Sequence, residues 1–379
     1  MIKYTALLRT VLTAVLLFYL PLSGKKVYGQ SGKTGLWVVR FQLKSKINID
    51  EVIEYAAENE ITDIFVQVVG RGRAFYKTDL LPVNPDIAVK DFDPLSYLCK
   101  KAETKGIHIH AWINVLFIWS KMNLPSEKNH FVNAYRNWFA VDDYNKNILS
   151  FKPNELQFRG IEGWFLSPAV QELRDYYRLI ASELIKNYGI RGIHLDYIRL
   201  PSRKYGYHLN SRMAYKKKYG TDPLLLKFGA DNELSQNLHK SWNKFRCNVV
   251  DSVVMAFKKV TDSYDNIVLS AAVKPDPEIA RENYLQNWES WLEKNIIDFV
   301  IVMNYTNKLN KFSKIADKIK ERVNFSNVWM GIGTYNQNID DTDKQVEFTI
   351  KNDINNIVFF SYQSILNKGL VIKDFNPGS

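Results

Sequence analysis

The sequence is poor in cysteine and lacks the motifs of several common enzyme classes. Only two cysteines, Cys99 and Cys247, occur among 379 residues, and neither has metal-ligand or disulfide-framework spacing. We expect two buried thiols, or one bridge. No Gly-x-Ser-x-Gly nucleophile elbow is present, and no glycine-rich phosphate loop follows the first predicted strand. The second absence disfavours a doubly wound open sheet, which is the main alternative fold.

Basic residues are in excess but are not concentrated in one segment. The formal net charge is +11, and it becomes +7 without the four basic residues of the first 29. No basic tract with interleaved aromatics is present, so no nucleic-acid partner is expected. A moderately basic exported protein could favour an anionic envelope polymer, although so dilute a charge usually serves only solubility.

The first 29 residues have the pattern of a secretory signal peptide. Lys3 and Arg9 precede an apolar run over residues 11–20, and Val27-Tyr28-Gly29 suits the usual cleavage positions. The run is too short to cross a bilayer, and no Cys follows it for a lipid anchor. We predict cleavage after Gly29 and a secreted or periplasmic protein, with an uncleaved anchor as the alternative. The mature domain, residues 30–379, is expected to have no integral membrane segment.

From residue 35 onward, apolar strand patterns alternate with amphipathic helix patterns. The predicted strands cover residues 36–43, 64–69, 107–116, 192–200, 267–274, 299–306, 328–335 and 357–363. The predicted helices cover residues 49–60, 95–105, 170–188, 233–263, 284–294, 311–323 and 343–352. This order predicts an α/β fold, a single (β/α)₈ barrel. Long loops are expected after the third and fourth strands, and the last helix should be short or missing.

The fourth predicted strand carries His194 and Asp196 on one face and apolar residues on the other. An unpaired buried carboxylate is costly, and the C-terminal ends of barrel strands are where active sites lie. Asp196 is therefore predicted to be functional. The structural alternative is a carboxylate that only pairs with Arg199 or His194.

The same alternation turns polar side chains of other strands toward the barrel interior. The expected inward set also contains Arg40, Gln67, His108, His110, Trp112, Asn114, Ser270, Ala272, Lys274, Val302, Asn304 and Thr306. Branched apolar groups usually fill a barrel centre. The large number of polar groups here therefore indicates a functional site. His108 could instead be a hydrogen-bonded core histidine, and Arg71 and Arg73 could be surface charges.

A groove with aromatic rings, amides, guanidinium groups and carboxylates suits a carbohydrate ligand. Glycoside cleavage usually needs two carboxylates, or one carboxylate and a substrate amide. Asp196 is the first candidate. For the second, Asp276 and Glu278 follow the fifth strand and Glu162 lies in the long loop after the third. The sequence leaves this choice open.

Six segments, in the expected order, resemble the glycosyl-hydrolase-like proteins of family ten, which are exported bacterial (β/α)₈ barrels. The matching segments are residues 35–40, 64–73, 110–115, 192–201, 269–280 and 298–306. The resemblance implies a barrel that acts on a bacterial polysaccharide, with peptidoglycan strands as a plausible substrate class, and it makes Asp196 the leading catalytic residue. Two positions depart from the family pattern, since Arg73 and Asn287 stand where acidic residues are usual.

The sequence therefore predicts an exported glycoside hydrolase with a polysaccharide substrate, no cofactor and no metal. The expected catalytic residues are Asp196, Asp276 and Glu278. The expected substrate-binding residues are Arg40, Gln67, Arg71, His110, Trp112, Asn114, Trp119, His194, Tyr197, Arg199, Lys274, Asn304, Tyr305 and Tyr362. Two alternatives remain: a glycan-binding barrel without turnover, and a metal-dependent hydrolase or deacetylase with ligands His110, His194 and Asp196.

Overall fold

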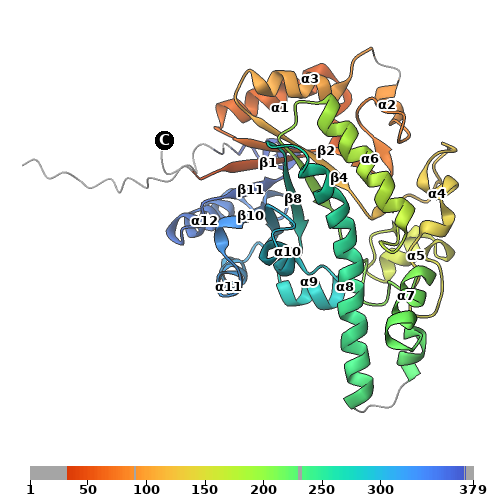
Figure 1. Ribbon diagram of the computed structural model, residues 1–379. Coiled ribbons are helices and arrows are strands. Elements are labelled where there is room, and N and C mark those ends of the chain that lie inside the picture. Colours follow the sequence, from red (N-terminus) through yellow and green to blue (C-terminus); the bar gives the residue numbers. More distant parts are fainter. Residues whose placement is uncertain (1–31, 89–90, 229–232, 371, 373–379) are drawn as a thin grey trace, which may run out of the picture.

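A computed structural model describes residues 32–88, 91–228, 233–370 and 372. Within these residues, eight parallel strands close into a barrel that is surrounded by helices (Figure 1). The barrel strands are β1 (Thr34–Val38), β2 (Asp63–Gly70), β4 (His108–Asn114), β7 (Gly192–Asp196), β8 (Val268–Val273), β9 (Phe299–Met303), β10 (Val328–Gly333) and β11 (Ile357–Phe360). β1 pairs with both β2 and β11, which closes the barrel. The predicted fold is confirmed, and the proposed signal peptide lies outside the described residues.

The helices that follow the strands cover the outside of the barrel. They are α1 (Lys46–Glu58), α3 (Pro94–Glu103), α6 (Gln171–Asn187), α8 (Glu233–Thr261), α9 (Pro277–Tyr284), α10 (Trp288–Glu293), α11 (Leu309–Lys320), α12 (Ile339–Lys351) and α13 (Tyr362–Leu366). Ser45, Asp93 and Asn338 cap the first turns of α1, α3 and α12 by accepting backbone N–H groups. The helix predicted over residues 284–294 begins later, at Trp288, because Tyr284 is the last residue of α9, which Leu285 ends with a left-handed backbone at φ of 55°.

The barrel interior is filled mainly by aromatic rings. Its core consists of Trp37, Phe65, Trp112, Ala272, Ile301, Trp329 and Val358. A larger apolar core lies between the strands and the surrounding helices. Both Cys99 and Cys247 are buried free thiols, which decides between the two expectations for them.

The structure corrects the predicted inward face of β9. Ile301 belongs to the core inside the barrel, whereas Val302 packs in the core outside it. β9 ends at Met303, and Asn304 Nδ2 donates to the backbone oxygen of Phe312 in α11. Asn304 therefore faces a helix. His108 lies exposed at the start of β4, so it is not a core histidine, but its Nδ1 lies 3.6 Å from the Asp63 Oδ1 that His110 also contacts, which puts both rings on the same face.

Two long connections build a second layer on one side of the barrel. The connection after β4 contains β5 (Phe117–Trp119), α4 (Phe131–Ala134), α5 (Pro153–Phe158) and β6 (Trp164–Phe165), and β5 pairs with β6. The connection after β7 contains α7 (Leu209–Tyr219) and η4 (Pro223–Phe228). The connection after β4 also contains the short helices η2 (Arg136–Trp138) and η3 (Ile148–Ser150). Short elements elsewhere are η1 (Arg40–Lys44), β3 (Arg73–Ala74), α2 (Pro85–Ala88), η5 (Phe325–Asn327) and η6 (Thr334–Asn336). Both long loops were predicted.

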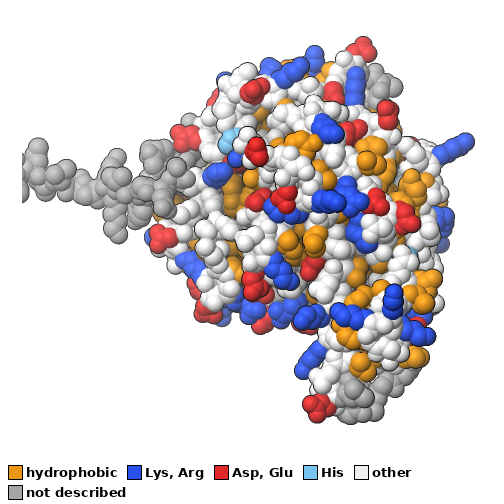
Figure 2. Space-filling model, viewed as in Figure 1, with side chains coloured by type: hydrophobic (Ala, Val, Ile, Leu, Met, Phe, Trp, Pro, Cys, Tyr) orange, Lys and Arg blue, Asp and Glu red, His pale blue; other side chains and the backbone are white. Residues whose placement is uncertain are grey.

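The first part of α8 and its neighbour α7 project beyond the barrel (Figure 1). Leu209, Met213 and Leu225 are exposed there, close to basic residues of α7, and Figure 2 shows apolar and basic side chains together on this projection. A small core of Tyr215, Leu226 and Trp242 holds the projection together. None of the helices in the described part of the chain is both long and apolar enough to span a membrane.

Asp251 is a buried carboxyl that costs stability at neutral pH. Its Oδ1 accepts a hydrogen bond of 2.6 Å from Trp291 Nε1, and burial raises its pKa to about 6. In Asp251→Asn the amide oxygen keeps that hydrogen bond without the buried charge. Because a raised carboxyl pKa lowers stability only where the group is ionised, the variant should be about 2 kcal/mol more stable at pH 8 and equal to wild type near pH 4.

Urea unfolding at the two pH values checks this prediction. Asp262→Asn is the matched control, because Asp262 forms an exposed pair with Lys258 on the same helix. Its stability should change little at either pH. An Asp251→Asn variant that is less stable than wild type at pH 8 would contradict the assignment.

Candidate functional site

The mouth of the barrel at the C-terminal strand ends holds a pocket of about 390 Å³. It is lined by Trp37, Val39, Arg40, Gln67, Arg71, Trp112, Asn114, Phe117, Glu162, Asp196, Tyr197, Arg199, Ala272, Lys274, Met303, Tyr305 and Phe360. Parallel strands all end at the same edge of a sheet, which explains why residues far apart in the sequence meet here. Nine of these residues were predicted as substrate-binding, and Asp196 as catalytic.

Asp196, the last residue of β7, is the buried carboxyl of this pocket. Its Oδ2 accepts a hydrogen bond of 3.2 Å from Trp112 Nε1, and its Oδ1 accepts one of 2.6 Å from the backbone N–H of Tyr197. Burial raises the pKa of Asp196 to about 6, although these hydrogen bonds and the charge of Arg199 oppose the shift. The group can therefore exchange a proton near neutral pH.

Glu162 is a second carboxylate in the same pocket. Its Oε1 accepts a hydrogen bond of 2.5 Å from Arg199 Nη2, and its buried Oε2 has no hydrogen-bond partner in the described structure. Glu162 lies just before β6, so the small β5–β6 sheet holds it over the barrel mouth. The Asp196–Arg199 pair considered from the sequence is replaced by a Glu162–Arg199 salt bridge.

Lys274, which follows β8, completes the charged rim near Asp196. Burial lowers the pKa of Lys274, and the positive charge of Arg199 lowers it further. Its Nζ lies 4.6 Å from the ring centre of Tyr284, and Arg199 approaches the same ring at 5.1 Å. Two cations therefore lie on the side of the pocket that holds Glu162.

A chain of polar side chains crosses the other side of the pocket. Arg40 Nη1 donates to Gln67 Oε1 at 2.6 Å, and Gln67 Nε2 donates to Asn114 Oδ1 at 3.1 Å. The last pair joins β2 to β4, and Asn114 is the register partner of Asp196. The chain runs from Arg40, just after β1, to Asn114 on β4, the strand next to Asp196.

Aromatic rings form the remaining walls. Tyr305 stacks on Phe360 with ring centres 5.3 Å apart, and Tyr197 stacks on Phe117 at 4.6 Å. Tyr305, Phe360 and Tyr197 all line the pocket and are partly exposed, although the Arg199 guanidinium also lies 4.9 Å from the ring centre of Tyr197. Such faces pack well against the apolar side of a sugar ring.

His110 and His194 lie below the pocket rather than in it. His110 Nε2 bonds Asp63 Oδ1 at 2.8 Å. Trp37 Nε1 donates to His194 Nε2 at 3.3 Å, so the proton of His194 is on Nδ1, which faces Ser270 Oγ at 2.9 Å. Burial lowers the pKa of His194 well below its usual value. Both rings thus support the core.

The metal-dependent alternative required His110, His194 and Asp196 to converge. In the structure each is bound to a different partner, as described above. No group of three His, Cys, Asp or Glu side chains suited to a metal ion occurs within residues 32–88, 91–228, 233–370 and 372. The ligand set proposed from the sequence is not assembled.

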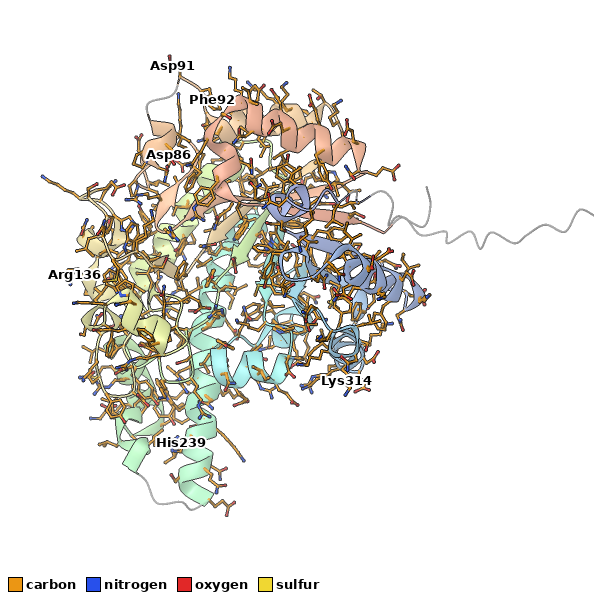
Figure 3. All side chains as sticks on the ribbon, turned by 180° about the vertical axis from the view of Figure 1, so that it is seen from behind. Asp86, Asp91, Phe92, Arg136, His239 and Lys314 are labelled. Atoms are coloured by element: carbon orange, nitrogen blue, oxygen red, sulfur yellow. The ribbon has the colours of Figure 1, made fainter. Side chains whose placement is uncertain are left out.

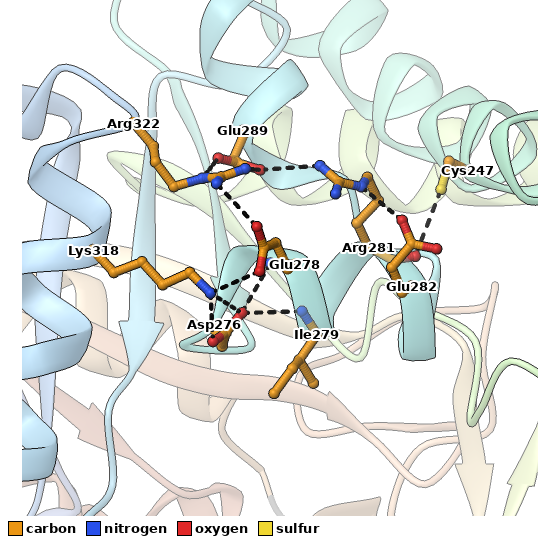
Figure 4. Close-up of polar contacts among 9 residues, drawn as sticks. All are labelled: Cys247, Asp276, Glu278, Ile279, Arg281, Glu282, Glu289, Lys318 and Arg322. Carbon is orange, nitrogen blue, oxygen red and sulfur yellow. Dashed lines mark hydrogen bonds and ion pairs between the residues drawn. The ribbon is translucent and has the colours of Figure 1, made fainter. Parts of the chain in front are cut away.

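Asp276 and Glu278, the other predicted catalytic residues, do not line the pocket. Asp276 caps α9 by accepting the backbone N–H groups of Glu278 and Ile279, and Lys318 of α11 bonds both carboxylates (Figure 4). Arg322 also pairs with Glu278. These two carboxylates tie α9 to α11 on the outside of the barrel.

Three predicted binding residues are also elsewhere. Trp119 of β5 is buried beneath Arg73, with its Nε1 bonded to the backbone oxygen of Asn123. Tyr362 opens α13 and packs against Tyr55 of α1 in the outer core. Asn304, as noted, faces α11. Each was assigned inward by extending a strand pattern or an aromatic loop beyond its true end.

Some pocket residues had not been predicted. Trp37, Phe117 and Phe360 were missed, and Glu162 had been only one of several candidates. Alternation from Arg40 would have turned Trp37 outward, because β1 ends at Val38 and Arg40 lies beyond it in η1, whereas Phe117 and Glu162 belong to a loop without any period. Of the two departures from the family pattern, Arg73 pairs with Glu127 and Asn287 lines a separate surface cavity.

The sequence is similar to two curated bacterial proteins. One, from Escherichia coli K12, is named glycosyl hydrolase DigH and is 22% identical over 199 residues, covering 48% of this chain and 40% of the relative. The other, from Bacillus subtilis strain 168, is named glycosyl hydrolase YngK and is 24% identical over 167 residues, covering 42% of this chain and 29% of the relative. The chain thus spans less than half the length of these relatives.

The fold is similar to a solved structure, the glycoside hydrolase domain of PgaB (BpsB) from Bordetella bronchiseptica. The TM-score is 0.63 with 12% sequence identity, over 89% of this chain and 96% of that domain. At this identity the likeness concerns the barrel fold. The sequence comparison goes further: the profile of the family described as glycosyl hydrolase-like 10 matches residues 32–352, which is most of the length, and this chain belongs to that family.

Proposed function

We propose that this protein is an exported glycoside hydrolase that cleaves a bacterial or environmental polysaccharide, such as the glycan strands of peptidoglycan. The observation that carries the proposal is the presence of Asp196 and Glu162 in one aromatic-walled pocket at the barrel mouth. Two carboxyl groups in different environments are the usual equipment for glycoside hydrolysis.

The environments of the two groups suggest their roles. Asp196 is buried, with a pKa raised to about 6, so it can hold a proton and give it to the leaving oxygen. Glu162 forms a salt bridge with Arg199, and its Oε2 has no hydrogen-bond partner within the described chain. We assign Asp196 as general acid and Glu162 as the base or nucleophile.

The rest of the pocket would position the sugar. Tyr305 and Tyr197 offer aromatic faces, and the Gln67–Asn114 pair offers amide groups that can bond hydroxyls. The curated names of the similar proteins point to the same reaction class. The name of the Bordetella domain does so as well.

Incubation of the purified protein with a panel of bacterial and plant polysaccharides tests the proposal. Mass spectrometry should find shortened oligosaccharides with new reducing ends. Binding of a glycan without any product would contradict hydrolysis and would favour a glycan-binding barrel.

The pH dependence of the rate should report the proton on Asp196. A general acid works only when protonated, and a pKa of about 6 means protonation is lost as the pH rises through that value. At pH 8 we expect kcat about 100-fold below its plateau at pH 5. Initial rates between pH 4 and 9 check this, and a rate that rises through pH 6 would instead require an ionised Asp196.

Export remains a proposal that rests on the pattern of the first 29 residues. Expression of the full chain in a bacterial host, followed by fractionation and N-terminal sequencing, tests it. We expect a mature protein that starts at Gln30 outside the cytoplasm. An intact N-terminus on protein in the cytoplasmic fraction would count against export.

A further inference from the structure

Two arginines in the pocket have no acidic partner. The only side-chain hydrogen bond of Arg40 to a described residue goes to the neutral amide of Gln67, and the side chain of Arg71 has none within residues 32–88, 91–228, 233–370 and 372. Burial, followed by the charge of Arg71, lowers the pKa of Arg40 to about 10. Two positive charges therefore lie near each other in a partly buried wall of the pocket.

A third arginine nearby does have an acidic partner, which Arg40 and Arg71 lack among the described residues. Arg73, two residues after Arg71, makes a bidentate salt bridge with Glu127 at 2.6 and 2.9 Å. Arg73 does not line the pocket, whereas Arg40 and Arg71 do. The chain thus supplies a carboxylate to the arginine outside the cleft and none to the two inside.

Local structure constrains the backbone of Arg71 and the side chain of Arg40. Arg71 follows β2 in the left-handed region with φ of 53°, a conformation that costs free energy for a residue other than glycine. Gly70 gives Arg40 its space, since a Cβ there would lie 3.1 Å from Arg40 Cδ. Phe41 also packs against Arg40, with the guanidinium 4.5 Å from the ring centre. The Arg40 guanidinium is therefore positioned before any ligand arrives, and Arg71 lines the same pocket.

We propose that Arg40 and Arg71 receive the anionic group of an acidic glycan, on a sugar bound next to the one whose linkage is cleaved. The proposal rests on the proposed function and adds the charge class of its substrate. Guanidinium groups bind carboxylate and phosphate oxygens through paired hydrogen bonds. An anion between the two arginines would also remove their mutual repulsion.

The two other cations of the pocket do not need such a ligand. Arg199 is neutralised by Glu162, and Lys274 lies in the field of both Glu162 and Asp196. The anion site is therefore on the β1–β2 side of the mouth, away from the carboxyl pair. Because of this separation, the negative charge of the substrate would not lie against Asp196 and Glu162.

Binding measurements on the full chain with Asp196→Asn, which should leave the glycan intact, test the proposal. The probes are polyuronates in native and carboxyl-reduced form, phosphate-substituted glycans before and after dephosphorylation, and neutral glucans. We expect a charged glycan to bind at least about tenfold more tightly than its neutralised form. Which pair shows the difference tells a carboxylate from a phosphate.

Arg40→Gln and Arg71→Gln, each added to Asp196→Asn, should lower affinity for the charged probe about tenfold and leave the neutral probe within twofold. Lys314→Gln is the control, since it removes the same charge from the exposed face of α11 (Figure 3). The melting temperature of Arg71→Gln should stay level or rise, because a like-charge contact is lost. A purely structural arginine would lower it.

The outcomes separate the two proposals. Asp196-dependent cleavage of neutral glycans, with no preference for charge, would support the hydrolase and overturn the anion site. Arginine-dependent binding of an acidic glycan that the wild-type protein leaves intact would support the anion site and contradict the hydrolase. An array in which no anionic glycan binds would also overturn the anion site.

Discussion

Asp196→Asn should lower the rate of glycan cleavage by about 1,000-fold or more while leaving the protein folded. Asn cannot donate a proton to the leaving oxygen, so the step assigned to Asp196 is lost. The fold should not suffer, because the substitution removes a buried charge whose cost is visible in the raised pKa. Product release measured by reducing-end assay, together with thermal unfolding, checks both halves of the prediction.

The thermal stability of Asp196→Asn is the control that separates loss of catalysis from loss of folding. At pH 8 the melting temperature of Asp196→Asn should equal or slightly exceed that of wild type, because only the wild type then carries the buried anion. Full activity in a folded variant would remove Asp196 from the mechanism. A drop of many degrees would show that the carboxyl mainly holds the end of β7.

Glu162→Gln should reduce kcat by about 100-fold or more, since an amide is neither a base nor a nucleophile. Gln keeps the size of the side chain, and its amide oxygen can still accept from Arg199. Substrate affinity, measured as binding to an inactive variant or as KM, should therefore change much less than kcat. The contrast between the two quantities separates a chemical role from a binding role.

Asp276→Asn and Glu278→Gln are matched controls for Glu162→Gln. Each removes one carboxylate charge, but from the ion-pair cluster between α9 and α11 (Figure 4). Their activity should remain within about threefold of wild type, with at most a modest loss of stability. If one of them lost activity and Glu162→Gln did not, the assignment of the second carboxylate would be wrong.

The barrel and half of the site were predictable because parallel strands have simple geometry. Eight apolar runs separated by helices leave few other folds, and alternation correctly placed Gln67, Trp112, Asn114 and Asp196 on the inner face. In β4 and β7 polar and apolar residues alternate clearly, whereas the pattern of β2 was less decisive and only allowed Gln67 inward. The phase of β4 and of β7 was therefore set by its own residues.

Alternation failed where a strand has no polar residue to fix its phase. β9 reads Phe-Val-Ile-Val-Met and is apolar on both faces, so the phase was taken from Asn304, which already lies beyond the strand. Tyr362 was misplaced for the same reason, since β11 ends at Phe360. A strand buried on both sides gives no sign of which side faces the axis.

The second carboxylate could not be chosen from the sequence because it lies in a loop. Glu162 owes its position to the pairing of β5 with β6, which joins residues about 45 positions apart and has no local signature. Asp276 could have been excluded, because Asp-Pro-Glu is a common start of a helix, with the Asp as cap and Pro in the first turn. Asp276 is the N-cap of α9.

The β5–β6 sheet has a consequence for how barrels of this family can diversify. Asp196 is fixed to the barrel, whereas Glu162 is carried by an insertion that pairs mainly with itself. The distance between the two carboxyl groups, which distinguishes inverting from retaining glycosidases, is thus set by an insertion outside the barrel strands. A change in the length of that insertion could exchange one stereochemical course for the other while every barrel strand stayed as it is.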